Sequence, residues 1–366
     1  MYAVKYTSFM NKMKTNTALD LINGPVRVIF EPTINCNLKC PMCDRTHKTE
    51  YEKHKKYQLS TNEILAFIND AINMGATNFQ IIGGGEPMMH PDILYFIETI
   101  KKRGVNLHLW TNGTLITEKN AELLSSNCDI ITVSLDSPHE EINDKLRGMP
   151  GATIRTVTGL RLLRRANPNA YLRIHSVLSA YNIAHLKDFL PLIDEIHINE
   201  VGGAKINPFS FVPSDFLISD CDQPKYDAII DDFCEELKQR EVNLAGCYAS
   251  ISKKMIDDIE SAMGVKDNCG SHITCLGLWS QVTVRPNGDV SICCFSYKPV
   301  LGNLHEMSFY DIWNSHKAES LREEVYRGVY LDSPCKGCDL GSPVFSRLLE
   351  SGEDMARFYH MINTSR

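Results

Sequence analysis

The sequence predicts an α/β protein with an open, partial (β/α)6 barrel followed by a small C-terminal α+β domain. Short apolar segments alternate with amphipathic helical ones from Val26 to about residue 200. This alternation is typical of a parallel sheet with right-handed crossovers. Residues suited to binding follow the ends of several expected strands. Beyond residue 270 the alternation gives way to a hairpin signal and a Cys-x2-Cys pair.

Composition narrows the class of protein further. The chain has 366 residues, 43% of them apolar and 23% charged, with a net charge of −7. Without a long basic run, nucleic acid and anionic membranes are not expected partners. The sequence shows neither a signal peptide nor an apolar run of membrane-spanning length. Thirteen cysteines in an apparently unexported chain indicate metal or redox chemistry, and we expect a cytoplasmic protein.

The expected elements follow one another closely. A strand over 26–31 leads into a cysteine-rich loop, and Ser60-Thr-Asn-Glu63 is a capping box that opens a helix ending at Gly75. A strand over 78–82 runs into Gly-Gly-Gly-Glu-Pro, and Pro91 opens a helix to Arg103. We further expect strands at 105–110, 129–134, 170–177 and 194–200 and helices at 117–126, 151–166 and 182–192.

The C-terminal third has a different pattern. Residues 201–222 are expected to form a loop, and 224–241 and 250–263 two helices. Strands over 281–285 and 289–294 flank Pro286-Asn287-Gly288, which is a strong hairpin signal. A helix containing Trp313 is expected after the hairpin. Four cysteines of this region could ligate a complete iron–sulfur cluster or a zinc ion: Cys275, Cys293, Cys335 and Cys338.

Chemistry in parallel sheets and barrels gathers at the carboxyl ends of the strands. The first strand ends at Cys36, Cys40 and Cys43, which form a Cys-x3-Cys-x2-Cys array. Three thiolates can hold three irons of a [4Fe–4S] cluster and leave one iron open. A zinc site completed by His47 is the alternative, since structural zinc takes four ligands. The next three strands are followed, in order, by Gly-Gly-Glu, Thr-Asn-Gly and Ser-Leu-Asp.

The cysteine array resembles that of the radical S-adenosylmethionine (SAM) enzymes. In that family SAM chelates the open iron, and one electron from the cluster cleaves it to a 5′-deoxyadenosyl radical that abstracts hydrogen from substrate. The C-terminal cysteines resemble the SPASM/twitch extension, which holds an auxiliary [4Fe–4S] cluster. The single 335/338 pair implies its one-cluster twitch form. The resemblance implies a lead-in (1–25), barrel (26–205), helical bridge (206–270), auxiliary-cluster domain (271–345) and tail (346–366).

The resemblance also implies which residues bind SAM. Gly84, Gly85 and Glu86 match the motif that meets the ammonium group of SAM, because glycine lets the backbone approach a ligand and a carboxylate can accept a hydrogen bond. Met42 occupies the position near adenine. Residues expected to meet the ribose or the carboxylate of SAM are Asn112, Ser134, Asp136, Arg147 and Arg173. Each of them also suits an ordinary structural role.

Substrate residues are expected among polar side chains near strand ends. The candidates are His108, Trp110, His175, Asn199 and Glu200. Glu200 or His175 could take a proton from the substrate. Cys247 could donate a hydrogen atom, although free cysteines are often buried hydrophobes.

The function expected from these features is radical oxidation of an alcohol in a sugar, aminocyclitol or nucleoside, with the auxiliary cluster as electron acceptor. Flavodoxin or ferredoxin would supply electrons. Three alternatives stay open: a redox-neutral epimerase that uses a cysteine hydrogen donor, a maturase of ribosomal peptides, and a zinc-binding interaction protein. The short lead-in leaves little room for a leader-peptide domain, which weighs against the maturase.

Overall fold

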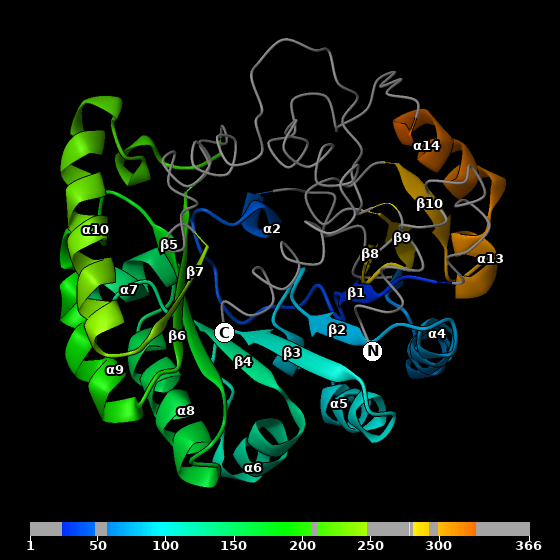
Figure 1. Ribbon diagram of the computed structural model, residues 1–366, viewed down its shortest axis with the longest axis horizontal. Coiled ribbons are helices and arrows are strands. Elements are labelled where there is room, and N and C mark those ends of the chain that lie inside the picture. Colours follow the sequence, from blue (N-terminus) through cyan, green and yellow to red (C-terminus); the bar gives the residue numbers. More distant parts are fainter. Residues whose placement is uncertain are drawn as a thin grey trace, which may run out of the picture.

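A computed structural model describes residues 24–47, 57–206, 211–246, 278, 281–292 and 299–326. A curved sheet of ten strands forms its centre, in the order β10-β9-β8-β1-β2-β3-β4-β5-β6-β7. Helices lie along the outside of this sheet, and the short helix α2 lies on its concave side (Figure 1). Among the described residues, no helix is long and apolar enough to cross a membrane.

The strands from β1 to β7 pair in parallel with their neighbours, and β8 pairs in parallel with β1. The two following strands are antiparallel. The strands are β1 (Arg27–Phe30), β2 (Asn78–Ile81), β3 (Asn106–Thr111), β4 (Ile130–Ser134), β5 (Leu172–Leu178), β6 (Glu200–Lys205), β7 (Asn243–Gly246), β8 (Gln281–Val284), β9 (Asp289–Ser291) and β10 (Val300–Asn303).

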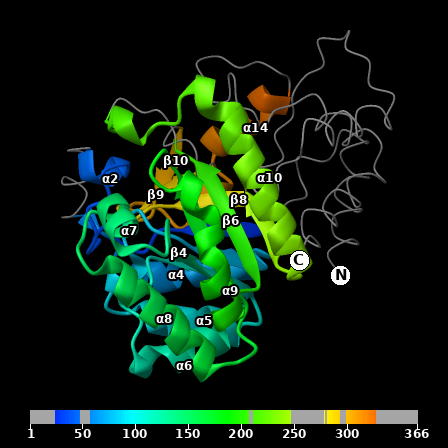
Figure 2. The ribbon, with the colours of Figure 1, turned by 90° about the vertical axis from the view of Figure 1, so that its left-hand side faces the viewer.

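Most of the longer helices connect consecutive parallel strands. A side view shows α7, α8 and α9 on one side of the sheet (Figure 2). The α-helices are α2 (Asp44–His47), α4 (Thr61–Asn73), α5 (Ile93–Lys102), α6 (Glu118–Asn127), α7 (Glu140–Arg147), α8 (Ala152–Ala166), α9 (Leu190–Ile196), α10 (Gln223–Gln239), α13 (Phe309–Trp313) and α14 (His316–Tyr326). The 3-10 helices are η3 (Pro87–Met89), η4 (Ile183–Phe189), η5 (Ser214–Phe216) and η6 (Asp220–Asp222).

The two faces of the sheet differ in polarity because successive side chains of a strand point to opposite faces. The outer face carries fully buried apolar residues such as Val28, Leu107 and Val133, which belong to the core shared with the helices. The inner face carries polar side chains in rows set by the strand register. One row runs through Trp110, Thr132, Arg173, Glu200 and Asn243. The barrel interior is therefore polar.

Most of the expected elements in the described residues are confirmed, including the capping box of Ser60 and Glu63 at the start of α4. The helix expected over 250–263 lies outside the described residues. The expected strand over 194–200 is wrong. Residues up to Ile196 belong to α9, His197 ends that helix with φ 55°, and β6 begins at Glu200. The residues over 195–199 alternate polar and apolar side chains, which favours a strand, whereas the buried Leu192, Ile193 and Ile196 follow the spacing of a helix.

Two further elements differ from expectation. Helix α7 was not expected, because its sequence has only two apolar residues, Ile142 and Leu146, among charged and polar ones. Strand β7 lies in the bridge that was expected to be helical, and it extends the sheet beyond β6.

The C-terminal hairpin is confirmed, with Gly288 in its turn at φ 83°. It continues the central sheet, because β8 lies directly beside β1. Phe309 of α13 packs against Phe67 of α4 with ring centroids 5.2 Å apart. Burial of a phenylalanine side chain contributes about 2 kcal/mol, so this contact helps to hold the C-terminal part against the barrel.

Candidate active site

The cysteine loop follows β1 at the carboxyl edge of the sheet. The amide of Cys43 donates a hydrogen bond to the carbonyl oxygen of Cys40 (3.1 Å), which folds the loop back on itself. Cys36, Cys40 and Cys43 are all partly buried free thiols. Burial raises the pKa of each thiol, that of Cys40 to about 12. A positively charged metal centre would offset that cost by stabilising the thiolates.

A single zinc ion needs its sulfur ligands close together. Among the described residues, Cys36, Cys40 and Cys43 do not form a group whose ligand atoms all lie within 4.8 Å of one another. Tetrahedral zinc with Zn–S bonds of about 2.3 Å would bring its sulfurs to about 3.8 Å apart. A four-iron cluster has no such requirement, because each cysteine binds a different iron.

The Gly-Gly-Gly-Glu-Pro segment packs directly against the cysteine loop. The amide of Gly85 donates to the carbonyl oxygen of Thr33 (2.9 Å), and that of Glu86 donates to the carbonyl oxygen of Asn35 (2.7 Å). A Cβ atom at Gly85 would lie 2.1 Å from the same Asn35 oxygen. Glycine is required here because the two backbones touch.

Glu86 joins this segment to the end of β3. Its buried carboxylate accepts hydrogen bonds from the Thr111 hydroxyl (2.6 Å), the Asn112 amide (2.7 Å) and the Met88 amide (3.1 Å). The side-chain amide of Asn112 in turn donates to Asn37 of the cysteine loop (2.9 Å). Glu86 and Asn112 therefore fix three strand-end loops relative to one another.

A buried ion pair lies on the other side of the cysteine loop. Arg147, the last residue of α7, is 2.7 Å from Asp136, which follows Ser134 at the end of β4. The carbonyl oxygen of Arg147 accepts hydrogen bonds from the Lys39 amide (3.3 Å) and the Cys40 thiol (3.5 Å). Asp136 Oδ2 and Arg147 Nε are buried without a hydrogen-bond partner among the described residues. Such atoms suit a polar ligand at this edge.

Arg173 and Glu200 lie deeper inside the barrel than the loops at the strand ends. They form an ion pair of 2.6 Å, and Glu200 also accepts a hydrogen bond from the Tyr171 hydroxyl (3.0 Å). Glu200 was expected at the end of a strand, but it is the first residue of β6. The register places the pair one inner-face row below Ser134 and His175. Both carboxylate oxygens of Glu200 are already engaged inside the barrel.

Three aromatic rings line the inner face next to this pair. The ring centroid of Trp110 lies 5.2 Å from that of His108 and 5.0 Å from that of His175. Burial lowers the pKa of His175 to about 4, so its imidazole is neutral near pH 7. The indole Nε1 of Trp110 and Nε of Arg173 are buried without a hydrogen-bond partner in the described part of the chain.

The other expected site residues are placed as follows. Met42 packs beside the apolar cluster of Leu146, Val212 and Phe216. The side-chain oxygen of Asn199 accepts a hydrogen bond from the Leu172 amide (2.9 Å), which is a structural role. Five expected site residues lie outside the described residues: Cys247, Cys275, Cys293, Cys335 and Cys338.

Sequence reasoning missed Glu31, the residue directly after β1. Its Oε1 lies 3.7 Å from Nη1 of Arg285, which follows β8, and both side chains are largely buried. A Cβ atom at Gly84 would lie 2.8 Å from Glu31 Oε2. The position at a strand end was a usable signal, but the partner Arg285 could not be found without the β1–β8 pairing.

The pKa of Glu31 predicts a pH dependence of stability. Burial raises this pKa from its ordinary value of 4.5 to about 7, against the opposing charge of Arg285. The folded state therefore binds the proton of Glu31 more tightly than the unfolded state does. The stability that this proton binding contributes is lost as the pH rises from about 4.5 through 7. Between pH 5 and 8, the wild-type protein should lose about 2 kcal/mol of unfolding free energy relative to Glu31→Gln. Anaerobic thermal unfolding of both proteins measures the difference, and a difference independent of pH would contradict the assignment.

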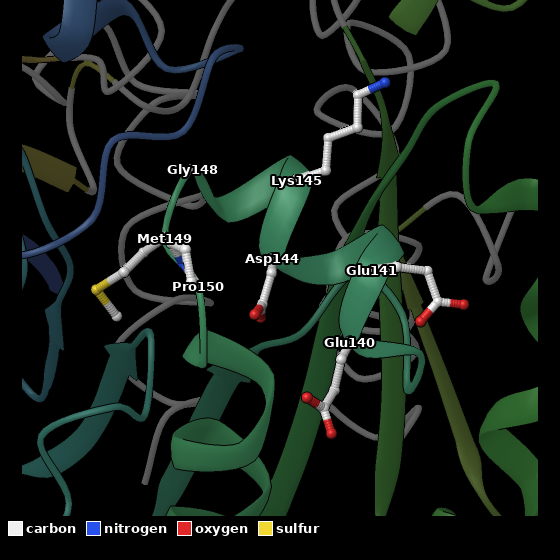
Figure 3. A pocket seen from close by; sticks show the side chains of 7 residues that line it. All are labelled: Glu140, Glu141, Asp144, Lys145, Gly148, Met149 and Pro150. Carbon is white, nitrogen blue, oxygen red and sulfur yellow. The ribbon is translucent and has the colours of Figure 1, made fainter.

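An open pocket of about 420 Å³ lies beside α7 (Figure 3). It is lined by Glu140, Glu141, Asp144, Lys145, Gly148, Met149 and Pro150. Asp144 accepts hydrogen bonds from the amide and hydroxyl of Thr153, so its carboxylate holds the start of α8. None of the lining residues is an expected SAM or cluster ligand, and we assign this pocket no catalytic role.

Three cysteine thiols lie at the carboxyl edge of a partial barrel, where glycine-rich and ion-paired loops hold them. This arrangement suits a protein that binds an iron–sulfur cluster next to a small ligand. The family model of the radical SAM superfamily matches residues 30–203, and that of the SPASM iron-sulfur cluster-binding domain matches residues 275–339. The chain belongs to the radical SAM superfamily and carries a C-terminal SPASM domain. Its cofactors are SAM and [4Fe–4S] clusters, one that binds SAM and one auxiliary.

The chain is similar to proteins with different substrates. It is 29% identical to the AdoMet-dependent heme synthase of Methanosarcina barkeri, over 87% of this chain and 92% of that protein. It is 23% identical to the PqqA peptide cyclase of Gluconobacter oxydans, over 88% and 84%. The crystal structure of Streptococcus suis SuiB bound to its precursor peptide SuiA has a TM-score of 0.67 at 17% identity, covering 94% of this chain and 76% of that one. This last similarity supports the fold.

Proposed function

We propose that this radical SAM enzyme modifies a peptide. A bound and reduced cluster held by Cys36, Cys40 and Cys43 would supply the electron that cleaves SAM, and SAM would supply the 5′-deoxyadenosyl radical for hydrogen abstraction. The observation that carries the proposal is the polar inner face of the barrel, where Trp110 Nε1 and Arg173 Nε are buried donors without partners. A peptide backbone presents carbonyl oxygens at regular spacing, which such donors can bind. The similarity to a PqqA peptide cyclase supports the same substrate class.

This proposal replaces a small sugar or alcohol as the favoured substrate. The relatives reported above are named for peptide and heme chemistry. The argument against a peptide substrate was that the short lead-in leaves little room for a domain that binds a leader peptide. Recognition of the peptide inside the barrel needs no such domain.

The barrel residues have distinct parts in this proposal. Arg173 forms an ion pair with Glu200 and can orient a carbonyl or carboxylate group of the substrate. The neutral imidazole of His175 packs on Gly202, where a Cβ atom would lie 2.9 Å from its Nδ1. His175 lies one row above Arg173, and its Nδ1 can accept a proton from the substrate radical when the auxiliary cluster takes up the electron. Its low pKa makes it a weak base, so the substrate proton must be acidified by radical formation.

A tetrapyrrole is the second candidate substrate, because the similarity to a heme synthase extends over 92% of that protein. Arg173 could bind a propionate carboxylate of such a ring. Its aromatic neighbours Trp110, His108 and His175 could contact the ring edge.

Substrate-dependent SAM cleavage tests the proposal. The anaerobic holoenzyme is incubated with SAM, dithionite and either short peptides encoded beside its gene or an iron porphyrin with propionate groups. A peptide substrate should raise 5′-deoxyadenosine formation well above the substrate-free rate and return with changed mass. Stimulation by the porphyrin alone, with a shift of its visible absorption, would establish the second candidate instead.

Trp110→Phe tests the substrate face directly. It removes one hydrogen-bond donor and keeps an aromatic ring, so KM for the peptide should rise about tenfold, as expected for one lost hydrogen bond of about 1.4 kcal/mol. Substrate-free cleavage of SAM should stay unchanged. An unaltered KM would remove Trp110 from the substrate site.

A further inference from the structure

We propose that His139, His185 and Asp188 form a surface binding site for a divalent transition metal such as Zn²⁺, separate from the iron–sulfur clusters. Nε2 of His139 lies 2.7 Å from Oδ2 of Asp188, and Nδ1 of His185 lies 3.0 Å from the same oxygen. In the part of the chain that the structure describes, this is the group of three potential ligands whose atoms all lie within 4.8 Å of one another.

The geometry suits zinc. Two imidazole nitrogens and one carboxylate oxygen form a common ligand set for Zn²⁺, with bonds of about 2.0–2.2 Å. Tetrahedral bonds of that length separate the ligand atoms by about 3.4 Å, so movements of less than about 1 Å would seat the ion. All three side chains are 41–45% exposed, which leaves a coordination position for water.

The local charges favour a cation. Hydrogen bonds from His139 and His185 lower the pKa of Asp188, so its carboxylate is ionised at neutral pH. Glu140 and Glu141 follow His139 on the first turn of α7 (Figure 3). The neighbouring ammonium of Lys187 lies 2.6 Å from Asp232, which neutralises part of its charge.

The ligands come from two separate elements. His139 is the N-cap residue of α7, while His185 and Asp188 belong to η4. A bound ion would therefore fix the start of α7 against η4. The other end of α7 contacts the cysteine loop through the carbonyl oxygen of Arg147. The eight residues of α7 span about 12 Å, so a metal bound at the start of α7 would stabilise the position of the cysteine loop at its other end.

Equilibrium dialysis of the anaerobic holoenzyme against Zn²⁺ tests the proposal, since the cluster cysteines are then occupied by iron. The double variant His139→Ala/His185→Ala should bind one zinc fewer per chain than the wild type. Asp188→Asn, which keeps the shape of the side chain, should weaken binding about tenfold. His316→Ala, which removes an exposed histidine of α14, should bind zinc like the wild type.

Hydrogen exchange gives a second readout. Zinc should slow amide exchange in residues 140–147 of the wild type but not in the double variant. Equal zinc content in the wild type and the double variant would overturn the proposal. So would wild-type protein that binds no zinc at about 100 µM free ion, which would leave the three side chains as a hydrogen-bonded cluster only.

Discussion

Replacement of Cys36, Cys40 and Cys43 by alanine should abolish SAM cleavage and leave about half of the iron. Each cluster holds four irons, so the reconstituted wild type should contain about eight per chain and the triple variant about four. The iron that remains belongs to the SPASM domain, which matches residues 275–339. Production of 5′-deoxyadenosine should fall to background, because SAM has no open iron to bind.

Iron analysis and chromatography of 5′-deoxyadenosine measure both quantities. Cys221→Ala is the matched control, since Cys221 is an exposed thiol outside the cysteine loop. Its replacement should change neither the iron content nor the formation of 5′-deoxyadenosine. Loss of all iron in the triple variant would show that the two clusters do not assemble independently. Retention of all eight irons would remove these cysteines from the cluster.

Gly148→Ala should disrupt the cysteine loop without replacing a cluster ligand. Gly148 ends α7 with φ 64°, and a Cβ atom there would lie 2.0 Å from the carbonyl oxygen of Lys39. Backbone at that distance cannot rotate away as a side chain can, so α7 and the loop must separate. We expect a loss of about 2–4 kcal/mol from left-handed strain and overpacking together. Binding of SAM should weaken at least about tenfold, because Cys40 follows Lys39.

Gly104→Ala separates the two contributions. Gly104 also has a positive φ, 72°, but a Cβ atom there meets nothing within 4 Å. Its substitution should cost only the left-handed strain of about 1 kcal/mol and leave SAM binding intact. Calorimetric titration with SAM and anaerobic thermal unfolding compare the two variants. Equal effects on both measurements would mean that the contact between Gly148 and Lys39 is unimportant.

The iron–sulfur chemistry was predictable from the sequence for a physical reason. Cys36, Cys40 and Cys43 lie within one short loop, so the sequence shows three thiolates that can share one metal centre, and the resemblance to radical SAM enzymes favoured an iron–sulfur cluster over zinc. The apolar strands and amphipathic helices carry their periodicity locally as well, and this predicted the parallel sheet. The hairpin at Pro286-Asn287-Gly288 was predictable because the turn needs a residue with positive φ, and Gly288 has one.

The placement of Glu200 was not predictable in the same way. Residues 195–199 (Glu-Ile-His-Ile-Asn) alternate polar and apolar side chains, and this short period-2 pattern predicts a strand. Packing in the core favours a helix over a strand here, since Leu192, Ile193 and Ile196 of α9 are all buried. Glu200 consequently begins β6, and its carboxylate meets Arg173 inside the barrel.

The sequence by itself determined the fold class and the grouping of three cysteines in one loop, because both follow from short-range patterns. Only the tertiary structure decided which distant residues share a site. The pairing of β1 with β8 brings Arg285 to Glu31, and the end of α7 brings Gly148 to Lys39. The approach of η4 to α7 likewise brings Asp188 to His139. These contacts depend on strand register and helix packing, which the buried core of the whole chain sets together and no local segment encodes.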